Sequence, residues 1–348
     1  DFASPPEVIE ALVERARHGV FGYTIPYREV EQEVLGYLRS RHRLVAEREW
    51  LFWLPGMVPA LNLACRAFAG PGEGVMTATP VYPPFLSAPA YSNRNLQAVP
   101  LQVDEDGWRF DFEAMEDNVT PDTRVFILCN PHNPVGRVYS RGELNDVHAF
   151  CERHDLVLIS DEIHCDLLLE EEMEHVPTLC LGERAAARTV TLLSPSKTYN
   201  LPGLACAYAV IPNPKLRAAI KRTARGLITE VNAFGYAGCA AAYRHGEPWR
   251  RELIAYLRGN RDELYEFVAT RLPGVRMWPM AATYLAWMDV SGLGLDEPGA
   301  FFAQHGVGLS NGADFGMPGF VRLNFGCRRA LLQQGLERIE AALDQPAG

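Results

Sequence analysis

The sequence contains no long apolar segment, no internal repeat and no tract of low complexity. A membrane-spanning helix needs about 20 consecutive apolar residues. The densest stretch of small apolar residues, Ala233–Tyr243, is shorter than that and contains two glycines. We therefore expect a soluble globular protein with no membrane partner, and its 348 residues are enough for one large core or two domains.

Positive charge is also scarce. Lys and Arg number 33 against 43 Asp and Glu, which gives a net charge of −10. Because nucleic-acid binding depends on Lys and Arg that contact phosphates, this balance argues against a nucleic-acid partner. The net negative charge does not exclude a small anionic ligand, since a single binding site needs only local positive charge.

The sequence has no C-x-x-C pair and no regular spacing of cysteines. Several of the eight cysteines lie inside apolar runs, where a free thiol behaves as a small hydrophobic group. This pattern indicates reduced thiols and a cytoplasmic setting. The cysteines are Cys65, Cys129, Cys151, Cys165, Cys180, Cys206, Cys239 and Cys327.

Strands and helices are expected to alternate through the first two thirds of the chain. Expected strands are Gly74–Thr79, Gln97–Val103, Val125–Cys129, Leu156–Ser160, Val190–Leu193 and Ala205–Ile211. Apolar spacing predicts helices over Glu7–Arg17, Arg28–Arg41, Gly56–Phe68, Glu143–His154 and Leu216–Thr223. This alternation indicates an α/β protein with a mostly parallel sheet.

The last hundred residues follow a different pattern. A long helix from Arg250, strands at Tyr284–Val290 and Val321–Phe325, and a final helix over Arg329–Leu343 predict a smaller α+β domain. No Ser/Gly-rich linker separates it from the rest, so the two parts should pack closely. We expect residues 1–22 to be an N-terminal segment on the small domain, residues 23–255 the large domain, and residues 256–348 the small one.

Three polar side chains follow the ends of three expected strands. Asn133, Asp161 and Lys197 come just after Val125–Cys129, Leu156–Ser160 and Val190–Leu193, respectively. In open α/β sheets, ligands bind beyond the carboxyl ends of the strands. These side chains could therefore converge on one cofactor, with Lys197 as a Schiff-base amine.

Pyridoxal phosphate requires such a set. A lysine binds its aldehyde, and an acid keeps its ring nitrogen protonated. Its phosphate needs backbone N–H groups at a helix start, which Gly56, Met57 and Val58 could supply with the hydroxyl of Ser194. These segments could therefore hold pyridoxal phosphate.

Each residue also has a structural interpretation when it is taken alone. Lys197 could be a solvated loop residue, Asp161 a helix N-cap and His164 a core histidine. Asn133 could serve only to shape the turn before a proline. Asp161 and His164 could also form a metal pair, but no third ligand with suitable spacing follows, so we expect no metal.

Several motifs resemble a known family. Asn130–Gly136, Ser160–His164 and Ser196–Gly203 are similar to motifs of fold-type I pyridoxal-phosphate enzymes of the class I/II aminotransferase superfamily. The resemblance runs in order along nearly the whole chain. It implies a three-layer αβα large domain with a mostly parallel seven-stranded sheet, plus a smaller α+β domain. Segments similar to the MalY/PatB branch of cystathionine β-lyases are His18–Tyr23, Pro55–Asn62, Pro80–Phe85, Asp161–His164 and Ala241–Trp249.

The resemblance assigns roles around the cofactor. Lys197 would hold it covalently, and Asp161 would pair with its ring nitrogen. Asn133 would bind its phenolic oxygen, with His164 near the same edge. Tyr82 would stack on or lie beside the ring and join Lys197 as a catalytic residue.

The resemblance also implies partners and a reaction. Tyr23 would reach the cofactor phosphate of a neighbouring subunit, which makes the protein a homodimer. Arg322 would clamp the α-carboxylate of an amino-acid substrate, a task that suits a guanidinium group. Lys197, once free, would remove the Cα proton. A thiolate would then leave from Cβ, and the products would be thiol, pyruvate and ammonia.

Some positions depart from the family pattern. Ala281-Ala282 stands where the family usually has Glu-Gly, and Cys327-Arg328-Arg329 replaces the usual Cys-Pro-Arg. Two alternatives to the lyase therefore stay open. One is an aminotransferase, although many of these have Tyr where this chain has His164. The other is a regulatory protein that binds the cofactor with little turnover.

Overall fold

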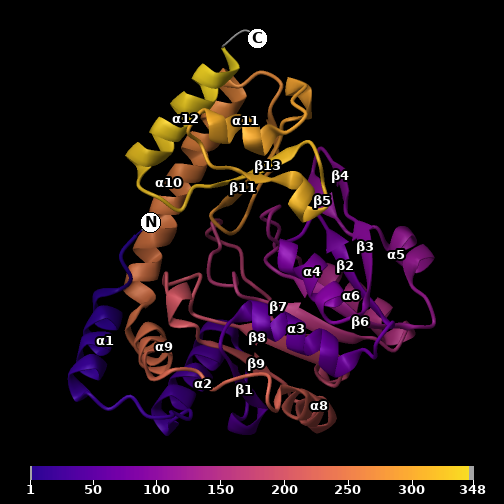
Figure 1. The fold of residues 1–348 in the computed structure, drawn as a ribbon, viewed down its shortest axis with the longest axis vertical. Helices are drawn as coiled ribbons and strands as arrows, with labels where there is room; N and C mark the ends of the chain where they lie inside the picture. Colours follow the sequence, from indigo (N-terminus) through magenta and orange to yellow (C-terminus); the bar gives the residue numbers. More distant parts are fainter. Residues whose placement is uncertain (1, 345–348) are drawn as a thin grey trace.

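A seven-stranded sheet forms the centre of the larger part of the molecule (Figure 1). The computed structural model describes residues 2–344. From edge to edge, the strands are β1 (Leu51–Leu54), β9 (Ala207–Val210), β8 (Thr189–Leu193), β7 (Val157–Asp161), β6 (Thr123–Cys129), β2 (Gly74–Thr79) and β3 (Asn95–Pro100). The strands from β8 to β3 run parallel, and β9 is antiparallel to both β8 and β1. The predicted mostly parallel sheet is confirmed.

The central strands are nearly continuous apolar runs because both faces of the sheet are covered. Side chains alternate between the two faces: Ile127 and Ile159 belong to one core cluster, Phe126 and Leu158 to the other. The first face packs against α3 (Met57–Phe68), α4 (Pro83–Tyr91) and α8 (Pro214–Ala224). The second packs against α2 (Arg28–His42), α5 (Phe112–Asn118), α6 (Arg141–Arg153) and α9 (Ala233–His245). These three layers are those expected, and the short helix α7 (Glu183–Ala186) precedes β8.

A four-stranded antiparallel sheet forms the smaller part, in the order β10 (Arg276–Met277), β11 (Leu285–Asp289), β13 (Phe320–Asn324) and β12 (Ser310–Asn311). Its core is shared with α10 (Glu247–Arg271), α11 (Pro298–Gln304) and α12 (Arg329–Leu343), seen at the top of Figure 1. The expected boundary after residue 255 falls inside α10, which packs against both α9 and α12.

The N-terminal segment lies mainly against the larger part. In α1 (Pro6–His18), Val8 is buried against Ala241 and Ala242 of α9. We expect this segment on the small domain, and Phe2 does contact that part, with its ring 5.2 Å from that of Tyr256 in α10.

The sequence interpretation missed β1, α9 and a break after β3. The expected strand over residues 97–103 ends at Pro100, and the N–H of Leu101 donates to the carbonyl of Thr79 instead. The chain then forms a hairpin from β4 (Gln102–Asp104) and β5 (Gly107–Arg109). None of the helices within residues 2–344 is long and apolar enough to cross a membrane.

Candidate active site

A cavity of about 320 Å³ opens at the carboxyl ends of β6, β7 and β8 and reaches the small sheet. The structure brings together every predicted site residue except Tyr23. Those lining the cavity are Gly56, Met57, Val58, Tyr82, Asn133, Asp161, His164, Ser194, Lys197 and Arg322. Residues up to 266 positions apart in the chain therefore share one site. The strand-end argument predicts the meeting of three of them, Asn133, Asp161 and Lys197.

Asp161 is the last residue of β7 and is buried. Its Oδ1 accepts a hydrogen bond from the N–H of Ile163 (3.1 Å). Burial raises the pKa of Asp161 to about 7, although this hydrogen bond and the Lys197 charge act in the opposite direction. A positive charge next to the carboxylate, such as a protonated ring nitrogen, would lower this pKa again and favour the ionised form of Asp161.

Lys197 follows β8 in a turn and lines the same cavity. Burial lowers the pKa of Lys197, and the Arg322 guanidinium lowers it further, whereas Asp161 raises it. The amine is therefore closer to its neutral, nucleophilic form than a solvated lysine.

His164 is a neutral imidazole in this environment. Burial, with the charges of Lys197 and Arg322, lowers the pKa of His164 to about 3. Its Nδ1 is buried and has no hydrogen-bond partner within residues 2–344. A buried polar atom without a partner in a cavity wall suggests a ligand that supplies one.

Arg322 extends from β13 of the small sheet to Asn133 of the large domain. Its Nη1 donates to Asn133 Oδ1 (3.0 Å) and its Nη2 to Ser310 Oγ (3.3 Å). The guanidinium also lies over the Phe315 ring, 4.7 Å from its centroid. This bond leaves the amide NH₂ of Asn133 as a donor for a cofactor oxygen. Burial lowers the pKa of Arg322, but a guanidinium keeps its charge and suits a carboxylate.

The start of α3 is an anion cradle. Gly56 precedes the helix with φ 126°, a conformation that favours glycine, and no side chain caps the first turn. The N–H groups of Gly56, Met57 and Val58 thus remain for an anion.

Ser194 is less suited to phosphate than we expect from the sequence. Its hydroxyl donates to the carbonyl of Cys206 (2.7 Å) and accepts from the N–H of Ser196 (3.1 Å). The hydroxyl proton is therefore committed to the main chain. Ser196, which lines the cavity directly before Lys197, offers a second hydroxyl at the same place.

The two tyrosines are placed differently. Tyr82 lies in the cavity wall just before α4, and its N–H donates to the carbonyl of Asn133 (3.1 Å). Tyr23 is fully exposed in the loop after α1 and does not line the cavity of its own chain.

The sequence interpretation gave no role to two further wall residues, Tyr284 and Asn324. Burial raises the pKa of Tyr284 to about 12, so its hydroxyl stays protonated. Asn324 lies two residues after Arg322 on the same strand and so faces the same side. That spacing is the signal that could have identified it.

Main-chain hydrogen bonds hold the loop of Ala281 and Ala282, which comes shortly before Tyr284 in the cavity wall. The N–H groups of both donate to the carbonyl of Gly136 (2.9 and 3.1 Å). The carbonyl of Ala281 accepts from Leu169, and Thr283 donates to Leu167. The loop therefore keeps its path without help from the side chains at 281 and 282.

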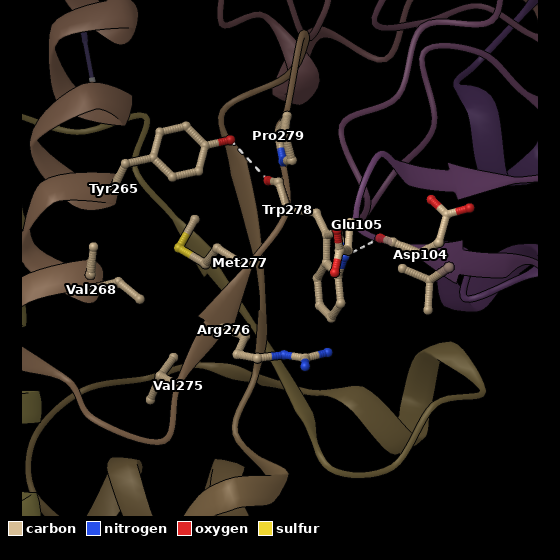
Figure 2. A pocket seen from close by; sticks show the side chains of 11 residues that line it. Asp104, Glu105, Tyr265, Val268, Val275, Arg276, Met277, Trp278 and Pro279 are labelled. Carbon is tan, nitrogen blue, oxygen red and sulfur yellow. Dashed lines mark hydrogen bonds between the residues drawn. The ribbon is translucent and has the colours of Figure 1, made fainter.

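A larger cavity of about 640 Å³ lies elsewhere, between the β4–β5 hairpin and β10 (Figure 2). The Trp278 indole donates to the carbonyl of Asp104 (2.8 Å), and the Tyr265 hydroxyl donates to the carbonyl of Trp278 (2.9 Å). Its lining residues include no lysine, cysteine, histidine or serine. We therefore place the chemistry in the smaller cavity, which fits pyridoxal phosphate through its amine, its buried carboxylate and its anion cradle.

Comparison with known proteins agrees with this fit. The family model for aminotransferase class I and II matches residues 1–339. Cystathionine beta-lyase PatB from Bacillus subtilis (strain 168) is 39% identical over 99% of this chain and 90% of its own length. The crystal structure of OvoB is 43% identical with a TM-score of 0.97, covering 100% of this chain and 91% of that one. Cystalysin from Treponema denticola, whose structure contains pyridoxal 5'-phosphate, is 31% identical with a TM-score of 0.94 over 98% and 88% of the chains.

Proposed function

We propose that this chain, which belongs to the aminotransferase class I and II family, is a pyridoxal-phosphate-dependent C–S β-lyase. It cleaves cystathionine or a related cysteine S-conjugate, and with water the products are a thiol, pyruvate and ammonia. The observation that carries the proposal is the meeting of Lys197, Asp161 and Arg322 in one cavity. These groups can bind the cofactor and an α-amino acid together.

When bound, pyridoxal phosphate supplies an aldehyde that takes up an amine and a ring that withdraws electrons from the neighbouring carbon. Lys197 holds this aldehyde until substrate arrives, and its released Nζ then removes the Cα proton of the substrate. The lowered pKa of Lys197 suits this role as a base. Asp161 keeps the proton on the ring nitrogen, and that cation in turn stabilises the buried carboxylate.

Arg322 binds the substrate carboxylate with its two Nη groups. The same Arg322 contacts Asn133, so the residue that holds the substrate also positions a residue for the cofactor's phenolic oxygen. We assign His164 to the same edge of the cofactor and Tyr82 to the face of its ring. The N–H groups of residues 56–58 hold the phosphate, with the hydroxyl of Ser196 from the same cavity wall.

A homodimer completes this proposal. Phe21, Tyr23 and Ile25 expose large apolar surfaces in the loop after α1, with Tyr23 fully exposed. An exposed apolar group of this kind is typical of an interface. Covering it with a second copy would bring Tyr23 to the phosphate of the partner's cofactor.

Borohydride reduction tests the cofactor assignment. The chain has three lysines, and Lys215 and Lys221 are both exposed on α8. We expect reduction to remove the visible cofactor band and to attach the cofactor to the peptide of Lys197. The Lys197→Ala variant should lack the band, whereas the control Lys215→Ala should keep it. Attachment to a different lysine would contradict the site.

Product analysis then separates the possible reactions. Cystathionine alone should yield pyruvate with wild-type protein and none with Lys197→Ala. Transfer of the amino group to an added keto acid, without pyruvate, would favour the aminotransferase. Bound cofactor with neither product would favour a regulatory protein.

A further inference from the structure

A second cluster of buried polar side chains lies behind the strand end that carries Asp161 and His164. His42 ends α2, and Cys165 and Asp166 directly follow His164. All three are at most 8% exposed. Their donor atoms lie within 4.8 Å of one another: His42 Nε2 is 3.6 Å from Cys165 Sγ and 3.5 Å from Asp166 Oδ1.

These separations suit a tetrahedral metal ion. Zinc binds imidazole nitrogen and carboxylate oxygen at about 2.0–2.2 Å and thiolate sulfur at about 2.3 Å. Two such ligands at a tetrahedral angle are therefore about 3.3–3.7 Å apart. The two printed separations from His42 Nε2 fall in this range. A nitrogen, a sulfur and an oxygen also form a donor set that zinc accepts.

His175 adds an independent observation. It is buried, its Nε2 lies 2.8 Å from Glu162 Oε2, and its Nδ1 has no partner within residues 2–344. A carboxylate that fixes one nitrogen of a histidine, leaving the other for a metal, is the usual second layer of a zinc site. His175 lies edge to face with His42, with ring centroids 5.7 Å apart. Both rings line a cavity of about 260 Å³ together with Cys165.

We propose that His42, Cys165 and Asp166 bind one Zn²⁺ ion, with the fourth position facing this cavity and His175. Binding replaces the S–H bond of Cys165 with an S–Zn bond and releases the proton to solvent. The ion ties the end of α2 to the segment just after His164. It therefore braces the wall of the active-site cavity from behind, outside the catalytic machinery.

Two neighbours already bind parts of this cluster. The Tyr37 hydroxyl donates to Asp166 Oδ2 (2.6 Å) and lies 2.8 Å from His42 Nε2. Arg41 Nε donates to Asp166 Oδ1 (3.0 Å). A metal must displace the Tyr37 hydroxyl from His42, whereas Arg41 can keep its bond, because a carboxylate oxygen has two lone pairs. The competing interpretation is thus a hydrogen-bonded network that needs no ion.

Titration of the chelator-treated holoenzyme with Co²⁺, as a spectroscopic substitute for Zn²⁺, tests the proposal. One Co²⁺ per chain should give the visible bands of a tetrahedral ion and a near-ultraviolet thiolate charge-transfer band. Zn²⁺ should remove both bands and raise the melting temperature. Wild-type protein that binds no Co²⁺ by equilibrium dialysis would overturn the proposal, whatever the variants do.

Variants locate the ion. Cys165→Ser should abolish the thiolate band, and both it and His42→Gln should lower Co²⁺ affinity at least about tenfold. Cys327→Ser, a half-buried cysteine of the small domain, is the matched control and should bind as wild type. The visible cofactor band reports that each variant is folded. A thiolate band that survives in Cys165→Ser would show that the ion lies elsewhere and would overturn the assignment.

Discussion

Lys197 and Arg322 are two basic side chains in one buried cavity, and the charge of Arg322 affects the pKa of Lys197. Burial lowers the pKa of both side chains, and Arg322 lowers the pKa of Lys197 further. Asp161 partly compensates by raising the pKa of Lys197. Arg322, the substrate clamp we propose, would therefore also help to prepare the Lys197 amine for the cofactor.

We expect the single substitution Arg322→Gln to shift the pH dependence of cofactor uptake. The neutral amine of Lys197 attacks the aldehyde, so uptake by the apoenzyme accelerates as pH rises through the pKa of Lys197. Removal of the guanidinium raises that pKa, so the variant needs a higher pH for the same rate. Stopped-flow measurement of the cofactor band checks this.

The control for this shift is Arg276→Gln, which removes an exposed guanidinium on β10 outside the catalytic cavity. It should follow the wild-type profile. An unshifted profile for Arg322→Gln would mean that the Arg322 charge does not contribute to the lowered pKa of Lys197.

Residue by residue, the sequence could predict which side chains meet but not every bond they make. Asn133, Asp161 and Lys197 follow strand ends, and parallel strands bring such ends together. The bond from Ser194 to Cys206 depends on β9 returning beside β8, which no local pattern encodes. His42 and Cys165 are 123 residues apart, so no spacing motif could indicate their contact.

Among elements, the long buried strands and amphipathic helices were predicted well, and short elements that depend on distant partners were not. The final helix has the predicted bounds, Arg329–Leu343. β1 has four residues at a sheet edge and exists because Leu51 pairs with Val210 far along the chain. The two-residue strands β10 and β12 likewise depend on their neighbours in the small sheet.

The turn at Gly136 allows a test of how closely it packs against the loop of residues 280–282. Its φ is +69°, and a Cβ there would lie 2.5 Å from Met280 Cβ and 3.2 Å from the carbonyl of Ala282. We expect Gly136→Ala to destabilise the protein by about 1–3 kcal/mol and to raise KM, because the 281–282 loop must move. Urea unfolding and steady-state kinetics measure the two effects.

Gly142→Ala is the matched control, because Gly142 lies in α6 and its added Cβ would meet nothing closer than 3.8 Å. It should be neutral or stabilising by up to about 1 kcal/mol. If both substitutions change the free energy of unfolding and KM equally, the close packing and positive φ at Gly136 do not limit the residue at this position.

At the scale of the whole molecule, the active site we propose is shared between two copies of the chain. In this proposal each chain provides the cavity with Lys197, and Tyr23 would come from the partner. The exposed apolar loop after α1 provides the reason for association. The site is then complete only in the dimer.

Hybrid dimers test this sharing. Lys197→Ala and Tyr23→Ala homodimers should each be weakly active or inactive. Refolded together in equal amounts, half of the dimers are mixed, and each mixed dimer has one site with both residues intact. Activity should recover to about a quarter of the wild-type value. If mass spectrometry detects mixed dimers but activity does not recover, Tyr23 does not belong to the partner's active site.

The main-chain bonds that hold residues 281–283 have an evolutionary consequence. Gly136, Leu167 and Leu169 fix the path of this loop through backbone groups alone. Mutations at Ala281 can therefore accumulate with little effect on folding, three residues before Tyr284 in the cavity wall. Descendants of this chain can therefore vary at this position by neutral drift, without first acquiring stabilising mutations elsewhere.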